Sequence, residues 1–164
     1  MLHLVKDPED HNIIVLFTTS RYPTSWLIRK ITKEPASHVA FLKDGLVLHS
    51  NFKGVNTIPL VEFLKTNRVV CALSGMQTER SFNRIVCKYW KTKYDFLALL
   101  YLAFRYILPK KWTKKANLWE TSALFLCTEF VTSEIEGKAD SLITPYQLFL
   151  RYKHRLDSNR SSNV

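Results

Sequence analysis

Residues 37–50, which read SHVAFLKDGLVLHS, decide the fold of this chain. They contain two short apolar runs separated by Asp44 and Gly45. An Asp-Gly pair between two such runs is the strongest short-range signal for a β-hairpin, because both residues tolerate the positive φ of a two-residue turn. We therefore predict antiparallel strands at residues 38–43 and 46–50.

The rest of the chain separates into a strand-rich part and a helix-rich part. Apolar, β-branched runs predict further strands at residues 12–19, 54–59 and 68–73. Helical spacing of apolar residues, with Pro and Gly at the ends, predicts helices at residues 25–32, 61–65, 78–90, 94–108, 124–136 and 144–152. Strands that precede helices in this way indicate an α+β fold, an antiparallel sheet packed against helices.

Length and composition indicate one globular domain. The chain has 164 residues, of which 46% are hydrophobic and 23% charged, as in ordinary globular proteins. We assign residues 1–156 to this domain and expect the polar residues 157–164 to form a flexible tail.

The net charge of +10 indicates that the protein could bind anionic partners. A basic surface attracts nucleic acid, anionic lipid or acidic cell-wall polymer. The densest basic run lies at residues 110–115, where four lysines are candidates for contact with an anionic surface (Lys110, Lys111, Lys114 and Lys115). The alternative is an ordinary solvated loop. No zinc-finger spacing or recognition-helix pattern indicates a specific nucleic-acid partner.

Cysteine usage and hydropathy favour a cytoplasmic protein. The three cysteines (Cys71, Cys87 and Cys127) form no CxxC pair, so we expect neither a disulfide framework nor a metal site, and we predict no cofactor. The opening residues do not resemble a secretory signal. The most apolar run, residues 96–108, contains Arg105. It falls short of the roughly 20 apolar residues that span a bilayer and is expected to be a buried helix.

Cys127 is the candidate nucleophile, because it lies near the start of a predicted helix. The positive end of a helix dipole favours a thiolate, whereas Cys71 is expected inside a strand and Cys87 inside a helix. The alternative is that Cys127 is a buried core thiol, which is a common environment for cysteine.

A base for this thiol is expected from the hairpin. His38 begins its first strand and His49 ends its second, so a two-residue turn should place them nearly opposite each other. One histidine could then act as the base. The other could form a hydrogen bond with the far ring nitrogen of that base and so fix its tautomer. The alternative is that both are ordinary strand-end residues.

Two sequence blocks resemble a known family. Residues 37–50 and the string LCTEFV at residues 126–131 are similar to the signature blocks of circularly permuted papain-like proteins. These belong to the NlpC-type superfamily, in its YiiX-like and lecithin retinol acyltransferase-like branch. Tyr94 and Asp95 resemble a Tyr-Asp motif of that family, and the likeness covers residues 13–135. One departure is Ala40, where family members often have glycine.

The resemblance implies roles for individual residues. Cys127 would be the nucleophile, His38 the base and His49 the third member of the triad, a place taken by a carboxylate in YiiX-like members. Tyr94 would line the cleft, with core packing as the alternative. Glu129 matches the family glutamate and would have a structural or substrate-binding role.

These observations predict a cysteine-dependent hydrolase that forms a covalent acyl-enzyme. The expected substrate is an amide bond in a peptide or peptidoglycan-like molecule. A thioesterase or lipid acyltransferase is the first alternative, and a non-catalytic basic binding protein is the second. A small chain of this kind would suit a bacterium or a phage.

Overall fold

The computed structural model describes residues 12–51, 54–78, 80–90, 93–94, 124–125, 127–140 and 143–161. Its strands are β1 (Asn12–Ser20), β2 (His38–Lys43), β3 (Leu46–Asn51), β4 (Gly54–Pro59), β5 (Asn67–Gln77), β6 (Lys93–Tyr94) and β7 (Leu124–Phe125). Its helices are α1 (Pro23–Thr32), α2 (Leu60–Thr66), α3 (Phe82–Tyr89), α5 (Cys127–Ile135) and α6 (Pro145–Ser161). The α+β class predicted from the sequence is confirmed.

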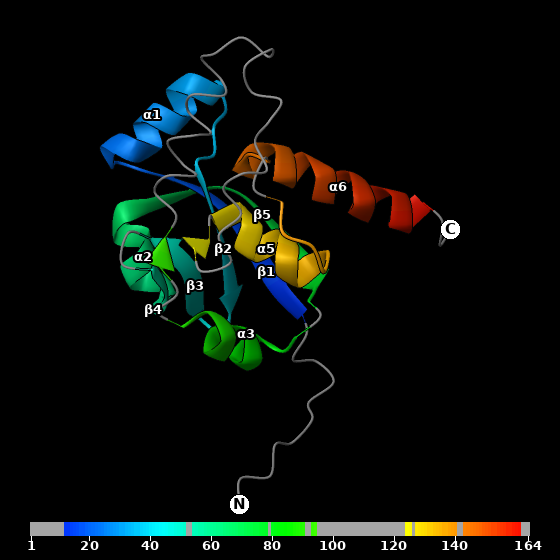
Figure 1. Ribbon diagram of the computed structural model, residues 1–164. Coiled ribbons are helices and arrows are strands. Elements are labelled where there is room, and N and C mark those ends of the chain that lie inside the picture. Colours follow the sequence, from blue (N-terminus) through cyan, green and yellow to red (C-terminus); the bar gives the residue numbers. More distant parts are fainter. Residues whose placement is uncertain are drawn as a thin grey trace, which may run out of the picture.

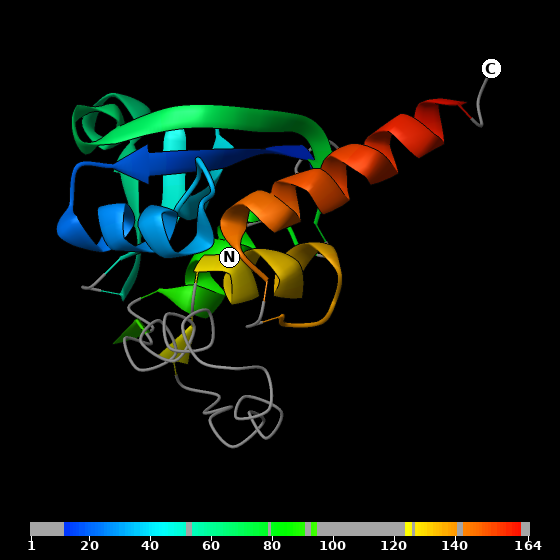
Figure 2. The ribbon, with the colours of Figure 1, turned by 90° about the horizontal axis from the view of Figure 1, so that it is seen from above.

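Five strands form one antiparallel sheet in the order β4-β3-β2-β1-β5. Helices α5 and α6 lie over one face of it, with α3 near one end (Figures 1 and 2). The strands alternate between two hydrophobic clusters. Val39 and Phe41 join the main core with residues of α3, α5 and α6, whereas Ala40 packs in a smaller cluster with Phe63 of α2. Such alternation follows from the two-residue period of a strand.

The hairpin between β2 and β3 has the turn that its sequence predicts. Asp44 has φ 49° and Gly45 has φ 76°, so both central residues are left-handed, as a type I′ turn requires. The described ladder between these strands runs from the Lys43–Leu46 pair to the Phe41–Leu48 pair. Beyond it, residues 38–40 pair with β1 and residues 49–51 pair with β4. The two histidines therefore lie past the end of the hairpin ladder.

Replacing Gly45 by alanine should lower the free energy of unfolding by about 1 kcal/mol, because a Cβ is strained at positive φ. No atom lies within 4 Å of the position that this Cβ would take, so the effect comes from the backbone alone. Urea unfolding of Gly45→Ala and Gly45→Asn measures it. Asparagine tolerates this conformation and should retain most of the stability, and equal losses in both variants would contradict the explanation.

Several boundaries differ from those expected. Strand β5 continues through Gly75 to Gln77, so the following helix begins at Phe82 rather than at residue 78. Leu124 and Phe125 form a short parallel pairing with β6, and α5 therefore begins at Cys127 itself. Helix α6 continues to Ser161, into the segment expected to be a tail. The predicted helix at residues 94–108 and the basic run at residues 110–115 lie outside the described residues, apart from Tyr94.

Candidate active site

Cys127 is the first residue of α5 and has 7% of its surface exposed. Its side chain belongs to the main core, next to Val39 of β2. Burial raises the pKa of the thiol to about 11, while hydrogen bonds from the backbone N–H groups of Val39, Thr128 and Cys127 itself oppose that rise. The resting group is therefore a neutral thiol, with N–H donors from a strand and a helix start directed at its sulfur.

Packing fixes the start of α5 against β2. The Phe130 ring lies 4.8 Å from the Phe41 ring and 5.1 Å from the Tyr89 ring of α3, measured between centroids. The same end of β2 carries His38, the residue immediately before Val39. The thiol therefore lies next to Val39, and the predicted base, His38, is the residue before Val39 in the strand.

His38 and His49 come together as the sequence predicted. Their ring centroids are 5.8 Å apart, and the rings meet edge to face. Both contact the Phe63 ring of α2, with centroid distances of 6.4 Å for His38 and 5.3 Å for His49. The pair therefore packs toward the smaller cluster, whereas the Cys127 side chain belongs to the main core.

Both histidines are neutral at neutral pH. Burial, together with a smaller effect of the neighbouring His49, lowers the pKa of His38 to about 3. Burial also lowers the pKa of His49 to about 4, against a smaller opposing effect of Asn56, its cross-strand neighbour on β4. A neutral imidazole can accept a proton, which is what a general base requires.

Three buried polar atoms near this pair lack hydrogen-bond partners among the described residues: His38 Nε2, His49 Nε2 and Asn56 Oδ1. The expected hydrogen bond between the histidines is therefore not made through either Nε2. Likewise, no hydrogen bond joins Cys127 to His38 or His49 within the described part of the chain. Buried polar atoms without partners are uncommon in proteins, so these atoms are available to a bound molecule.

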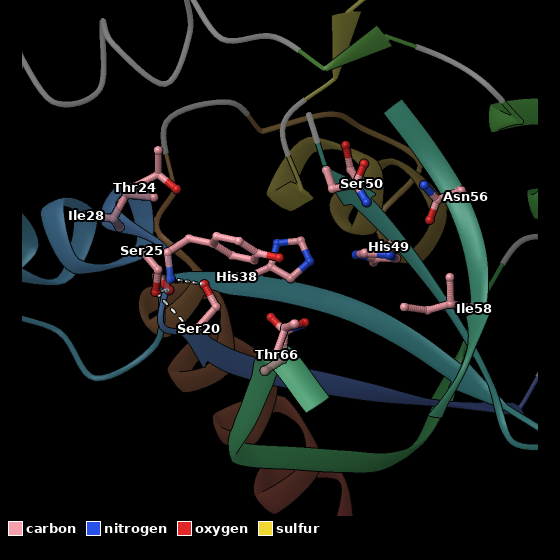
Figure 3. Close-up of a pocket in the computed structure, with 14 residues that line it drawn as sticks. Ser20, Thr24, Ser25, Ile28, His38, His49, Ser50, Asn56, Ile58 and Thr66 are labelled. Atoms are coloured by element: carbon pink, nitrogen blue, oxygen red, sulfur yellow. Dashed lines mark hydrogen bonds between the residues drawn. The ribbon is translucent and has the colours of Figure 1, made fainter. Parts of the chain in front are cut away.

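A cavity of about 490 Å³ opens at this end of the sheet, and both histidines line it. Figure 3 shows them in one pocket, with α1 on one side and β4 on the other. The lining consists mainly of hydroxyl and carboxamide side chains and includes no charged side chain (Ser20, Tyr22, Thr24, Ser25, Ile28, Ser37, His38, His49, Ser50, Asn51, Asn56, Ile58, Thr66 and Asn67). The pocket suits an uncharged, hydrogen-bonding ligand.

Hydroxyl groups fix one wall of this pocket. The Ser25 hydroxyl of α1 lies 2.6 Å from the Ser37 hydroxyl and 3.2 Å from the Thr19 hydroxyl, and it accepts the Ser20 N–H at 3.0 Å. These contacts join α1 to the end of β1 and to the residue before His38. They hold the start of β2 in place.

The remaining sequence candidates lie nearby. Glu129 is in the first turn of α5 and is partly buried, and its charge adds to the rise in the Cys127 pKa. Tyr94 lies in β6, which pairs with β7 just before α5, and its side chain lies outside the described set. Cys71 is half-buried in β5 and Cys87 is exposed on α3. The described residues contain no His, Cys, Asp or Glu cluster that could hold a metal ion.

Sequence reasoning missed two residues, Glu134 and Asn56. The Glu134 side chain is fully buried on α5. Its carboxylate accepts hydrogen bonds from Tyr89 at 2.7 Å, Lys88 at 2.9 Å and Arg80 at 3.0 Å. Burial opposes ionisation, but these bonds together hold the pKa of Glu134 below its usual range. A glutamate four residues after Phe130, on the same helix face, was the available signal.

Comparisons with protein-family models, with curated proteins and with solved structures gave no match. None of the helices in the described residues is long and apolar enough to cross a membrane.

Proposed function

We propose that the chain is a papain-like cysteine hydrolase in which Cys127 is the nucleophile, His38 the general base and His49 its neighbour in the triad. The observation that carries the proposal is the position of Cys127. A helix start and the Val39 N–H both direct donors at its sulfur. His38 precedes Val39 in the strand, with its ring toward the smaller cluster. A thiol that is only core filling has no need of such donors.

The chemistry follows from these groups. His38 removes the thiol proton as the sulfur attacks a carbonyl carbon, and the backbone N–H groups at the start of α5 stabilise the negative charge that develops. The tetrahedral intermediate expels the amine, which takes the proton from His38. Water then hydrolyses the thioester, with His38 again as base, and the thiol is restored.

This mechanism differs from one with a preformed ion pair. With His38 near pKa 3 and Cys127 near pKa 11, the resting pair is neutral and the proton moves only during attack. Because the His38 ring packs toward the smaller cluster and Cys127 toward the main core, the ring must move toward the thiol for that transfer. Catalytic hydrogen bonds in free enzymes are often loose and tighten when substrate binds.

Both histidines line the pocket but Cys127 does not, and the lining groups favour an amide over a long acyl chain. Ile28 and Ile58 are its aliphatic side chains, and the other lining groups donate or accept hydrogen bonds. An amide offers an N–H to Asn56 Oδ1 and a carbonyl to a histidine Nε2–H. We therefore place peptide-like amides ahead of the thioesterase or lipid acyltransferase alternative.

Alkylation by iodoacetamide at neutral pH tests the proposal. Loss of the base in His38→Ala should slow modification of Cys127 by about 100-fold, in the range that general bases contribute. Peptide mass spectrometry follows each cysteine separately, so the exposed Cys87 provides an internal standard whose rate should not change. His154→Ala, on the exposed side of α6, is the matched control variant.

The alternative of a non-catalytic binding protein gives a different result. In that case Cys127 reacts at the same slow rate with and without His38, as expected for a core thiol. Equal rates of Cys127 alkylation in wild type and His38→Ala would therefore contradict the catalytic proposal.

A further inference from the structure

Helix α1 exposes large apolar side chains, although Ile28 is partly buried and lines the pocket. Its buried side carries the Ser25 hydroxyl, which is hydrogen-bonded to Ser37 and Thr19. Its outer side carries Trp26 and Leu27, which are 53% and 44% exposed. A helix on a globular protein ordinarily turns its apolar stripe toward the core, so the outer face of α1 is built for contact with something else.

Cations accompany these side chains: Lys30 and Lys33 are exposed, whereas Arg29 is partly buried and the acidic residue Glu34 follows directly. Residues 21–33 contain Arg21, Arg29, Lys30 and Lys33 and no carboxylate. The Lys30 Nζ lies 4.6 Å from the centroid of the Trp26 ring. Tyr22, directly before the helix, is 54% exposed. We call the exposed set Tyr22, Trp26, Leu27, Lys30 and Lys33 the α1 surface.

We propose that the α1 surface docks the protein on an anionic lipid membrane, with α1 lying in the plane of the interface. Tryptophan and tyrosine rings sit at the level of lipid headgroups. Interfacial helices combine such rings with lysine or arginine, and each cation near an anionic leaflet strengthens binding. A soluble polyanion would use the lysines but would leave Trp26 and Leu27 in water.

Docking in this way has a consequence for the pocket. Tyr22 and Thr24 belong both to the α1 region and to the pocket lining, so the pocket would lie close to the lipid surface. The proposal does not depend on Cys127 chemistry, because it concerns binding alone.

Co-sedimentation with vesicles tests this docking. The whole chain should bind vesicles of mixed phosphatidylcholine and phosphatidylserine and should not bind phosphatidylcholine alone. Trp26→Ala/Leu27→Ala should weaken binding at least about tenfold, as loss of a buried apolar face at the interface predicts. Trp90→Ala is the matched control, because Trp90 is 48% exposed at the C-cap of α3, and this variant should bind like wild type.

A second pair of variants tests the charges. Lys30→Glu/Lys33→Glu should also weaken binding by at least about tenfold. Lys138→Glu/Lys153→Glu makes the same change in net charge at exposed positions elsewhere, and it should have a much smaller effect. Tryptophan fluorescence should shift to the blue on binding in wild type and in Trp90→Ala but not in Trp26→Ala/Leu27→Ala.

Three outcomes would overturn the proposal. The first is no binding to phosphatidylserine vesicles. The second is equal weakening by the test and control variants, which would indicate net charge alone. The third is binding to soluble polyglutamate as tight as to vesicles and without the fluorescence shift, which would indicate an acidic protein surface instead.

Discussion

Acidification from about pH 7.5 to about pH 5 should lower the free energy of unfolding by up to about 4 kcal/mol. The cause is the pair formed by His49, which is buried, and His38, which is partly buried. The pKa of His38 is about 3 and that of His49 about 4 in the folded chain, whereas an unperturbed histidine has a pKa of 6.5. Below pH 6.5 the unfolded chain therefore binds more protons than the folded one, and stability falls as pH falls. The loss continues until the pH reaches the folded pKa values.

Urea unfolding at the two pH values measures this effect. In His38→Gln/His49→Gln neither position titrates, so this variant should lose less than about 1 kcal/mol over the same range. His154→Gln, at an exposed position on α6, should retain the full dependence on pH. A wild-type protein that is equally stable at both pH values would show that the histidines are not held neutral.

Glu134→Ala should destabilise the protein by about 3 kcal/mol, at the lower end for removal of one partner from a buried ion pair. The carboxylate is fully buried, but Arg80 and Lys88 are about two-fifths exposed, so water can solvate them when it is lost. The Tyr89 hydroxyl loses its acceptor at 2.7 Å as well. Thermal or urea unfolding would measure the change.

Glu62→Ala is the matched control for this variant. Glu62 pairs with Lys65 at 2.6 Å, but both side chains are more than half exposed, and such pairs contribute at most about 1 kcal/mol. If Glu134→Ala lowers the free energy of unfolding no more than Glu62→Ala does, the buried contacts of Glu134 do not stabilise the protein as predicted. Because Glu134 is on the helix that begins at Cys127, the variant should also change the rate at which Cys127 is alkylated.

The hairpin and its histidines could be predicted because their signals are local. The Asp44-Gly45 turn fixes the register of the hairpin, and the two strands continue past that ladder to carry His38 and His49 into the same pocket. The presence of α5 was also predictable, because apolar spacing places Phe130 and Val131 inward, but its start was not: the predicted helix began at residue 124 and α5 begins at Cys127.

Other features depend on contacts between distant segments. Arg80 and Lys88 reach Glu134 across the interface of α3 and α5, and no spacing within a single segment encodes that pairing. Asn56 enters the pocket through its pairing with His49. The burial that moves the pKa values of Cys127 and the histidines is likewise a property of the packed molecule.

The order of the strands has a consequence for how the protein folds. All five strands of the main sheet lie within residues 12–77, and most neighbours in the sheet are also neighbours along the chain. Contacts between nearby segments close with less loss of entropy and form sooner. During synthesis the strands emerge from the ribosome before α5 does. The two histidines would then be in place while the segment that carries Cys127 is still unfolded, and Cys127 would enter the main core only when α5 docks on the finished sheet.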